Sequence, residues 1–368
     1  MAIINGDCLE VMATLADSSI DLICTDPPYF KVKADWWDRQ WDKPEGFLEW
    51  LDQCAAQWQR LLKPNGSLYC FASPRMAARV EVLLGERFNV LNSIRWVKEA
   101  GWHQKASKEE ARQFKEPWEA IIFCEHYGAD NIAKGEAGYG AKCDELRGFV
   151  FAPIVDYLKA ERDKAGWQNE DAKKAVGHSP SSGCHWFDRS QWTLPTQIVY
   201  KTWQIKAPGY FTRPYEELRQ QYEELRRPFS VTADVPYTDV WTFPTVSHYP
   251  GKHPCEKPAP LLEHIVTASS RPGSVVLDCF AGSGSTLLAA QKLGREFIGI
   301  EIDPHWVATI NHRLGNFDHN APTLEDRVTW LETQVKAHGS RLKRQQGTAS
   351  KVISGQLGLF EALDALGV

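Results

Sequence analysis

The sequence predicts an α/β fold with a mainly parallel sheet of seven strands and a helical unit inserted into it. Three observations predict it. Short apolar runs alternate with segments of helical spacing near both ends of the chain, as in a parallel sheet covered by helices. This alternation stops between about residues 128 and 248, where helical segments follow one another. After it resumes, a buried strand leads into a glycine-rich turn at 280–284.

The composition is that of a large globular protein. The chain has 368 residues, of which 43% are hydrophobic and 24% charged, enough for a large α/β core. A net charge of −5 excludes a protein that coats nucleic acid by bulk positive charge, although a local basic surface would suffice for DNA. No apolar run approaches the roughly 18 residues of a membrane span, so we expect a cytoplasmic protein. Nine scattered cysteines without a Cys-x-x-Cys pair indicate neither a disulfide framework nor a metal site, and we expect them to be reduced and mostly buried.

The first part of the predicted sheet comes from the first 127 residues. Apolar runs predict strands at 2–6, 20–24, 67–72, 91–97 and 118–124. Helical spacing predicts helices at 8–15, 47–62 and 75–84. The sequence Lys-Pro-Asn-Gly at 63–66 is typical of a helix end.

An acid, two prolines and an aromatic ring follow the strand at 20–24. Asp26 can accept one N–H of an exocyclic amine on a planar base, and the carbonyl of Pro27 can accept the other. Tyr29 can stack on the ring of such a base. Taken alone, Asp26, Pro27, Pro28 and Tyr29 fit an ordinary strand exit with a proline turn equally well.

The loop after Tyr29 is long for a compact domain and carries several tryptophans among charged residues. Trp36, Trp37 and Trp41 are candidates to line a DNA cleft, and packing of the loop over the domain is the alternative. In the stretch 98–115, Lys105 is a candidate phosphate contact, although Glu109 and Glu110 dilute the positive charge.

The inserted stretch predicts helices at 152–164, 168–176, 195–204 and 215–227. A turn at 165–167 between two helices, followed by a possible recognition element at 178–191, has the element order of a helix-turn-helix. Plain scaffold packing is the alternative. His185, Trp186 and Arg189 fall on this possible recognition element, where arginine is the commonest reader of guanine. For each of the three, a core or surface position without DNA contact is the alternative.

The alternation resumes at residue 253. We expect helices at 258–268, 285–293 and 304–314 around strands at 274–279 and 296–300, then a further helix at 322–336. The turn from Phe280 to Gly284 lets the backbone approach a ligand closely, and Glu301 ends the next strand, where an acid can accept two ribose hydroxyls. Leu287 stands where a dinucleotide site would want a third glycine, so a nucleoside with a non-phosphate substituent fits better than a nicotinamide cofactor.

Three motifs in this order resemble the β-class S-adenosylmethionine-dependent DNA amino-methyltransferases. They are Asp-Pro-Pro-Tyr at 26–29, His-Pro-Cys-Glu-Lys-Pro at 253–258 and Phe-Ala-Gly-Ser-Gly at 280–284. The resemblance implies a circularly permuted, Rossmann-like methyltransferase sheet. Its implied parts are a catalytic half (1–127), an inserted DNA target-recognition region (128–248), a cofactor half (249–316) and a C-terminal helix and tail (317–368).

The resemblance also implies site residues. The base-holding residues are Asp26, Pro27, Pro28 and Tyr29. The residues implied to bind S-adenosylmethionine are Asp7, Cys8, Asp26, Lys257, Asp278, Phe280, Ala281, Gly282, Ser283, Gly284, Ser285, Thr286, Glu301 and Ile302. Cys255 departs from the family pattern, which commonly has threonine there, and a lysine that caps the following helix is the alternative for Lys257.

The implied reaction moves a methyl group to N6 of a flipped adenine in duplex DNA, without a metal. Within the family an aspartate before Pro-Pro-Tyr favours adenine and a serine favours cytosine N4, and both amines suit the same chemistry. An RNA amino-methyltransferase and a catalytically silent DNA-binding regulator are further alternatives. The family implies a homodimer, and Gln356 to Phe360 resemble a peptide that docks on the bacterial sliding clamp. Neither a cognate endonuclease nor the DNA site can be predicted.

Overall fold

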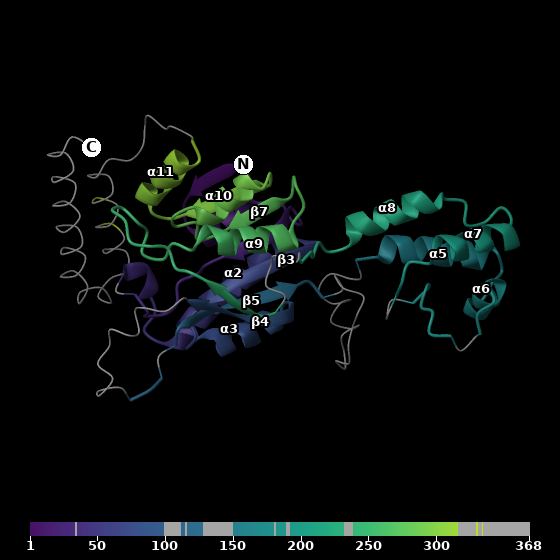
Figure 1. The fold of residues 1–368 in the computed structure, drawn as a ribbon, viewed down its shortest axis with the longest axis horizontal. Helices are drawn as coiled ribbons and strands as arrows, with labels where there is room; N and C mark the ends of the chain where they lie inside the picture. Colours follow the sequence, from purple (N-terminus) through teal and green to yellow (C-terminus); the bar gives the residue numbers. More distant parts are fainter. Residues whose placement is uncertain are drawn as a thin grey trace.

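The computed structural model describes residues 1–33, 35–98, 112–114, 116–127, 150–179, 182–188, 192–231 and 238–315, together with 329 and 333. These residues form a twisted sheet covered by helices on both faces and a separate helical lobe (Figure 1). Of the predicted helix at 322–336, only Thr329 and Thr333 are described, and both are helical, while the tail that contains Gln356 and Phe360 lies outside the described residues.

The described sheet has eight strands in the order β1-β8-β7-β2-β3-β5-β4-β6. Neighbouring strands run parallel, except that β5 is antiparallel to both β3 and β4. The strands are β1 Ala2–Asn5, β2 Ile20–Thr25, β3 Leu62–Ala72, β4 Asn89–Lys98, β5 Trp118–Glu125, β6 Val240–Phe243, β7 Val275–Asp278 and β8 Glu296–Glu301.

The prediction of seven strands was therefore wrong by one. The additional strand is β6, which pairs in parallel with β4. Arg95 lies opposite Val240, and Lys98 lies opposite Phe243. The strand β6 lies inside the stretch predicted as a helical insert. Its four residues are too few to show a periodicity, so the sequence pattern did not reveal it.

Two hydrophobic cores lie on opposite faces of the sheet because successive strand side chains point to opposite sides. On β2, Ile23 belongs to one core, and Leu22 and Cys24 to the other. The first core is closed by α1 Cys8–Thr14, α2 Pro44–Leu61 and α3 Ala77–Gly85, and the second by α9 Ala259–Ser269, α10 Ser285–Lys292 and α11 Pro304–Arg313. Of the eight described cysteines, six are buried, as predicted for most of them.

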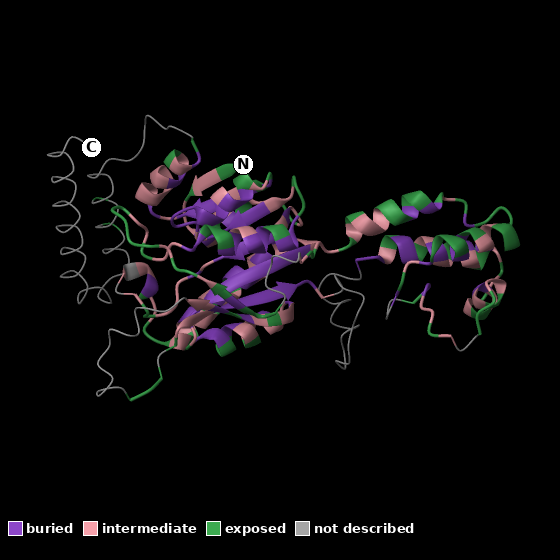
Figure 2. Cartoon of the chain, in the orientation of Figure 1, coloured by how far each residue is buried: buried purple, intermediate pink, exposed green. Residues whose placement is uncertain are grey.

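The helical lobe consists of α5 Ala152–Lys164, α6 Asn169–Ala175, α7 Gln197–Lys206 and α8 Tyr215–Leu225. The lobe has a hydrophobic core of its own. Figure 2 shows buried residues both in the sheet and in the lobe. Trp203 of α7 is fully buried in the core of the lobe, and its indole N–H donates to the carbonyl of Ala172 at 2.9 Å. The two helices predicted around the turn at 165–167 are α5 and α6, joined through Gly166 at a φ of +71°, and the described residues 182–188 of the predicted recognition element carry no helix.

The lobe joins the sheet at the edge where the parallel strands begin. Glu125 ends the antiparallel strand β5 beside Ser67, and Arg227, just after α8, forms a 2.5 Å ion pair with Glu125. Asn65 donates to the carbonyl of Glu224 in α8 at 2.9 Å. We call this the amino edge of the sheet, and the edge where β2 and β7 end the carboxyl edge. In the described part of the chain, no helix is both long and apolar enough to cross a membrane.

We expect Trp203→Ala to lower the free energy of unfolding of the helical lobe by about 3–5 kcal/mol, because it leaves a large cavity in the core of the lobe. Urea unfolding followed by circular dichroism checks this. Ile205→Ala is the matched control, since Ile205 lies on the same helix with 76% of its surface exposed. That variant should change stability by less than about 0.5 kcal/mol. Equal effects of the two substitutions would contradict this account of the lobe.

Candidate active site

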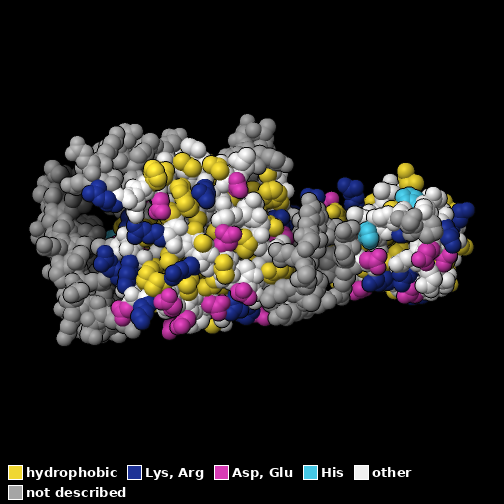
Figure 3. Space-filling model, turned by 90° about the horizontal axis from the view of Figure 1, so that it is seen from below, with side chains coloured by type: hydrophobic (Ala, Val, Ile, Leu, Met, Phe, Trp, Pro, Cys, Tyr) yellow, Lys and Arg dark blue, Asp and Glu magenta, His cyan; other side chains and the backbone are white. Residues whose placement is uncertain are grey.

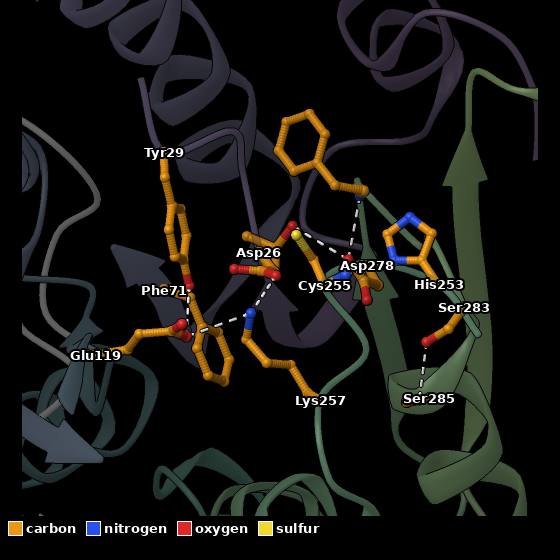
Figure 4. Close-up of polar contacts among 12 residues, drawn as sticks. Asp26, Tyr29, Phe71, Glu119, His253, Cys255, Lys257, Asp278, Ser283 and Ser285 are labelled. Atoms are coloured by element: carbon orange, nitrogen blue, oxygen red, sulfur yellow. Dashed lines mark hydrogen bonds and ion pairs between the residues drawn. The ribbon is translucent and has the colours of Figure 1, made fainter. Parts of the chain in front are cut away.

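Two sequence motifs about 250 residues apart meet at the carboxyl edge of the sheet. The strands β2 and β7 are parallel neighbours, with Leu22 opposite Val276 and Ile23 opposite Leu277. The residues that follow both strands therefore lie side by side. The hydroxyl of Thr25 links them, since it donates to Asp278 at 3.3 Å and accepts from the backbone N–H of Cys279 at 3.2 Å. Figure 4 shows the resulting cluster of polar side chains.

Asp26 stands at the centre of this cluster. One carboxylate oxygen, Oδ2, accepts a hydrogen bond from the ammonium of Lys257 (Figure 4). The other oxygen, Oδ1, is buried and accepts no hydrogen bond from any residue that the structure describes. Burial raises the pKa of Asp26, and the positive charge of Lys257 opposes that shift. A buried acceptor without a donor is costly, which marks Oδ1 as a place for a ligand N–H.

Glu119 joins the residues around Asp26. Its Oε2 accepts the hydroxyl of Tyr29 at 2.9 Å and lies 3.4 Å from the ammonium of Lys257. Its Oε1 accepts from Lys98 at 2.5 Å. Burial alone would raise the pKa of Glu119, but the two lysines outweigh it and lower the pKa to about 2. Glu119 is not among the site residues predicted from the sequence, where a charge inside an apolar strand was the available signal.

The turn after the two prolines is held in an unusual conformation. Phe30 and Lys31 have positive φ angles of 60° and 62°, a conformation that costs energy in non-glycine residues and often marks functional sites. The fully buried carboxylate of Asp38 holds the turn. It accepts from the backbone N–H of Tyr29 at 2.6 Å and of Lys33 at 2.5 Å. The sequence pattern did not single out Asp38 either.

The tryptophans of this loop have different surroundings. Trp41 packs against Trp50 and Phe47, with ring centroids 4.8 and 5.1 Å apart, so the packing alternative holds for Trp41. Trp37 is half-buried. The side chain of Trp36 lies outside what the structure describes, and so does Lys105.

The glycine turn after β7 wraps around Glu301. Gly282 and Gly284 have φ angles of +49° and +75°. A Cβ on Gly282 would come within 3.0 Å of the His253 ring, and one on Gly284 within 2.8 Å of Ile310. The backbone N–H of Gly282 donates to one oxygen of Glu301 at 2.8 Å, and that of Asp303 to the other at 2.8 Å. Burial raises the pKa of Glu301 to about 7.

Most other predicted cofactor residues surround this turn. Asp278 is buried, which raises its pKa to about 6, and it accepts from the N–H of Phe280 at 3.1 Å. Asp7 caps α1 and lies beside Glu301, because the N–H of Gly6 donates to the carbonyl of Glu301. Of the remaining predicted residues, Ala281 and Ser283 lie in the turn, Ser285 and Thr286 begin α10, and Ile302 follows β8. Cys8 differs, since its thiol lies in the hydrophobic core 4.0 Å from the thiol of Cys54 and not in the site.

The predicted recognition element lies in the helical lobe, away from this cluster. Trp186 is only 6% exposed and packs edge-on against Trp203 with centroids 5.1 Å apart. The prediction that Trp186 contacts DNA was therefore wrong, because the lobe uses its ring as core. The side chain of His185 is 36% exposed and lies 3.8 Å from Asp188. Arg189 lies outside the described residues. Within the described ranges, no three His, Cys, Asp or Glu side chains gather as a metal site.

The sequence profile of a family described as DNA methylase, which joins N6 and N4 methyltransferases, matches residues 20–312. The chain belongs to this family. It is an S-adenosylmethionine-dependent DNA amino-methyltransferase, as the resemblance implied. The match spans both halves of the sheet and the lobe between them.

Individual proteins are similar over most of their length. The DNA adenine methyltransferase YhdJ of Escherichia coli is 28% identical over 344 residues, which cover 92% of this chain and 91% of that protein. The type II methyltransferase M1.MboII of Moraxella bovis is 26% identical over 319 residues, 85% of this chain and 96% of that one. The solved structure of the cytosine-N4-specific PvuII DNA methyltransferase has a TM-score of 0.49 at 15% identity, covering 89% of this chain and 90% of that one.

The residues at the carboxyl edge suit S-adenosylmethionine. Glu301 is fixed by two backbone N–H groups, and each of its oxygens keeps a lone pair for a ribose hydroxyl. Gly282 and Gly284 keep side chains out of the turn beside it. The buried carboxylate of Asp278 lies on the same turn. Its negative charge suits a ligand that carries an amino group and a positive sulfur.

Proposed function

We propose that this enzyme methylates N6 of adenine in duplex DNA. The observation that carries the proposal is the buried Oδ1 of Asp26, an acceptor without a donor among the described residues, at the end of β2. Pro27 follows directly and supplies a carbonyl oxygen. These two acceptors match the two N–H groups of an exocyclic amine.

The residues around the base would act by orientation. The lone pair of an aromatic amine is delocalised into the ring, so the amine is a poor nucleophile. Two hydrogen bonds, to Asp26 and to the carbonyl of Pro27, favour a pyramidal nitrogen with its lone pair free for attack. When bound, S-adenosylmethionine supplies an electrophilic methyl group on a positively charged sulfur. The ring of Tyr29 would stack on the flipped base and offset part of the unstacking cost of a few kcal/mol.

The cofactor contacts follow from the geometry of the carboxyl edge. Glu301 would bind the ribose, Asp7 the adenine, and Asp278 with the turn from Phe280 to Gly284 the methionine part. Lys257 was predicted to bind the cofactor. Its ammonium contacts Asp26 and Glu119, so its main role would be toward the base-holding residues.

Adenine is favoured over cytosine by the aspartate of the motif. The DNA adenine methyltransferase YhdJ, similar over 92% of this chain, supports the same choice. Cytosine N4 remains the second candidate because its amine can bind the same two acceptors.

DNA would bind at the carboxyl edge, where Lys257 before α9 and Glu119 near the start of β5 lie beside Asp26 and Tyr29. Figure 3 shows charges of both signs mixed with hydrophobic side chains on the face it presents, so DNA binding would depend on local groups. Target recognition by the insert, a homodimer, clamp binding through Gln356 to Phe360 and a cytoplasmic location stay predictions.

Asp26→Ala should lower methyl transfer by at least about 100-fold, because the amine loses one of two acceptors. Cofactor binding should persist within about threefold. A tritium-transfer assay and calorimetry with S-adenosylmethionine measure the two. Asp21→Ala is the control at the other end of β2, where Asp21 pairs with Lys63 at 2.8 Å and holds the N–H of Val275. An active Asp26→Ala enzyme would refute the assignment.

Duplex DNA methylated by the enzyme should contain N6-methyladenine on nucleoside mass spectrometry, because an aspartate precedes the Pro-Pro-Tyr sequence. N4-methylcytosine alone would overturn the choice of base. A parallel reaction on RNA of the same sequence should give no product, and equal methylation of RNA would contradict a DNA enzyme.

Cofactor binding should weaken as the pH falls, because Glu301 has a raised pKa of about 7 and must be ionised to accept two hydroxyls. Between pH 8 and pH 6 the affinity for S-adenosylmethionine should fall by up to about tenfold. Glu301→Gln should bind weakly at both pH values and lose this dependence, while Glu296→Gln, an exposed change at the start of β8, should behave as wild type. Calorimetry with S-adenosylmethionine at both pH values measures these affinities. A wild-type pH dependence in Glu301→Gln would assign the titration to another group.

A further inference from the structure

Glu119 lies in a row of four charged side chains that come from four separate parts of the fold. The row begins with Lys98 at the end of β4, followed by Glu119 near the start of β5. Lys257 before α9 comes next, and Asp26 after β2 ends the row. Their side chains are 23%, 14%, 9% and 17% exposed in this order. Each charge therefore depends on its neighbours in the row more than on water.

The signs alternate along the row, so two ammonium groups face two carboxylates and the sum is zero. Lys257 sits between Asp26 and Glu119, with its ammonium 3.4 Å from Oε2 of Glu119. Without the charge of Glu119, Lys257 would have Asp26 as its only carboxylate partner in the row. Both oxygens of Asp26 would then be drawn toward one ammonium, and Oδ1 would no longer be kept for a ligand.

Glu119 also holds the aromatic ring of the same motif. The hydroxyl of Tyr29 donates to its Oε2 at 2.9 Å, across 90 positions of sequence. The ammonium of Lys257 lies 5.2 Å from the centroid of the Tyr29 ring and 5.0 Å from that of Phe71. Figure 4 shows Tyr29 and Lys257 converging on Glu119. The carboxylate of Glu119 thus holds the ring of Tyr29 in place for stacking. It also holds Lys257, the counter-ion of Asp26.

We propose that Glu119 is a positioning residue for methyl transfer. It shares Lys257 with Asp26, which leaves Oδ1 of Asp26 available to the amine, and it fixes the ring of Tyr29 against which the base stacks. The proposal rests on the proposed role of Asp26 and adds that the arrangement of Asp26 and Tyr29 depends on a carboxylate from β5.

Glu119→Gln tests this, because the amide keeps the size of the side chain and removes its charge. We expect kcat to fall by about 10- to 100-fold, as for misplaced reacting groups, with the Kd for S-adenosylmethionine changed by less than about threefold. The matched control is Glu125→Gln at the other end of the same strand. Glu125 forms a buried ion pair with Arg227 at 2.5 Å and accepts from Asn89 at 2.9 Å, away from the site. This control should lose stability and keep kcat.

The fall of kcat at low pH, the acid limb of its pH profile, is a second readout. A loss of packing alone would not change the pH at which kcat falls. The negative charge of Glu119 raises the pKa of Asp26, so Glu119→Gln should move the acid limb to lower pH. Glu125→Gln should leave the limb in place. The titratable groups facing Asp26 are Lys257, Glu119, Tyr29, Asp278, Cys24, Cys70 and Cys255.

Tyr29→Phe removes the hydrogen bond that the Tyr29 hydroxyl donates to Glu119 and serves as the second variant. It should lower kcat, and its effect should be smaller in the Glu119→Gln background, because coupled residues are not additive. Wild-type kcat in folded Glu119→Gln would overturn the proposal, as would losses of kcat and stability that match those of Glu125→Gln. If Glu119→Gln does not fold, wild-type kcat in Tyr29→Phe overturns it. An active Asp26→Ala would instead refute the proposed function beneath it.

Discussion

The parallel pairing of β2 with β7 is the contact on which the site depends. It places the ends of two strands from opposite ends of the sequence next to each other, with Thr25 bonded to both Asp278 and Cys279. One strand end carries Asp26 with the two prolines and Tyr29, and the other carries the glycine turn. Because β8 adds to the other side of β7, Glu301 reaches the same edge. The order of the strands thus brings Asp26, the glycine turn and Glu301 to one edge of the sheet.

The buried charges at this edge are balanced by partners that come from other strands and loops. Asp26 and Glu119 share Lys257, while Glu301 is stabilised by two backbone N–H groups. The two glutamates therefore differ in pKa, because lysines lower the pKa of Glu119 to about 2 and burial raises the pKa of Glu301 to about 7. Carboxylates in one site are therefore suited to separate tasks.

Much of this could be predicted from the sequence, for physical reasons. Proline pairs, glycine turns and strand-ending acids are local patterns, so Asp26, Gly282 and Glu301 could be picked out from the sequence. Their roles followed only from the three motifs in order, because the turn at Asp26 alone fits an ordinary strand exit equally well. Glu119 and Asp38 could not be picked out, because their roles come from contacts with residues distant along the chain or from a turn with unusual backbone angles. Trp186 was misassigned because a tryptophan among polar residues looks the same in a small core as on a binding surface.

The helical lobe starts and ends at the amino edge, while Asp26 lies at the carboxyl edge. The six residues of β2 separate the two edges by about 20 Å. A duplex bound at the active site would have to span this distance to contact the lobe of the same chain.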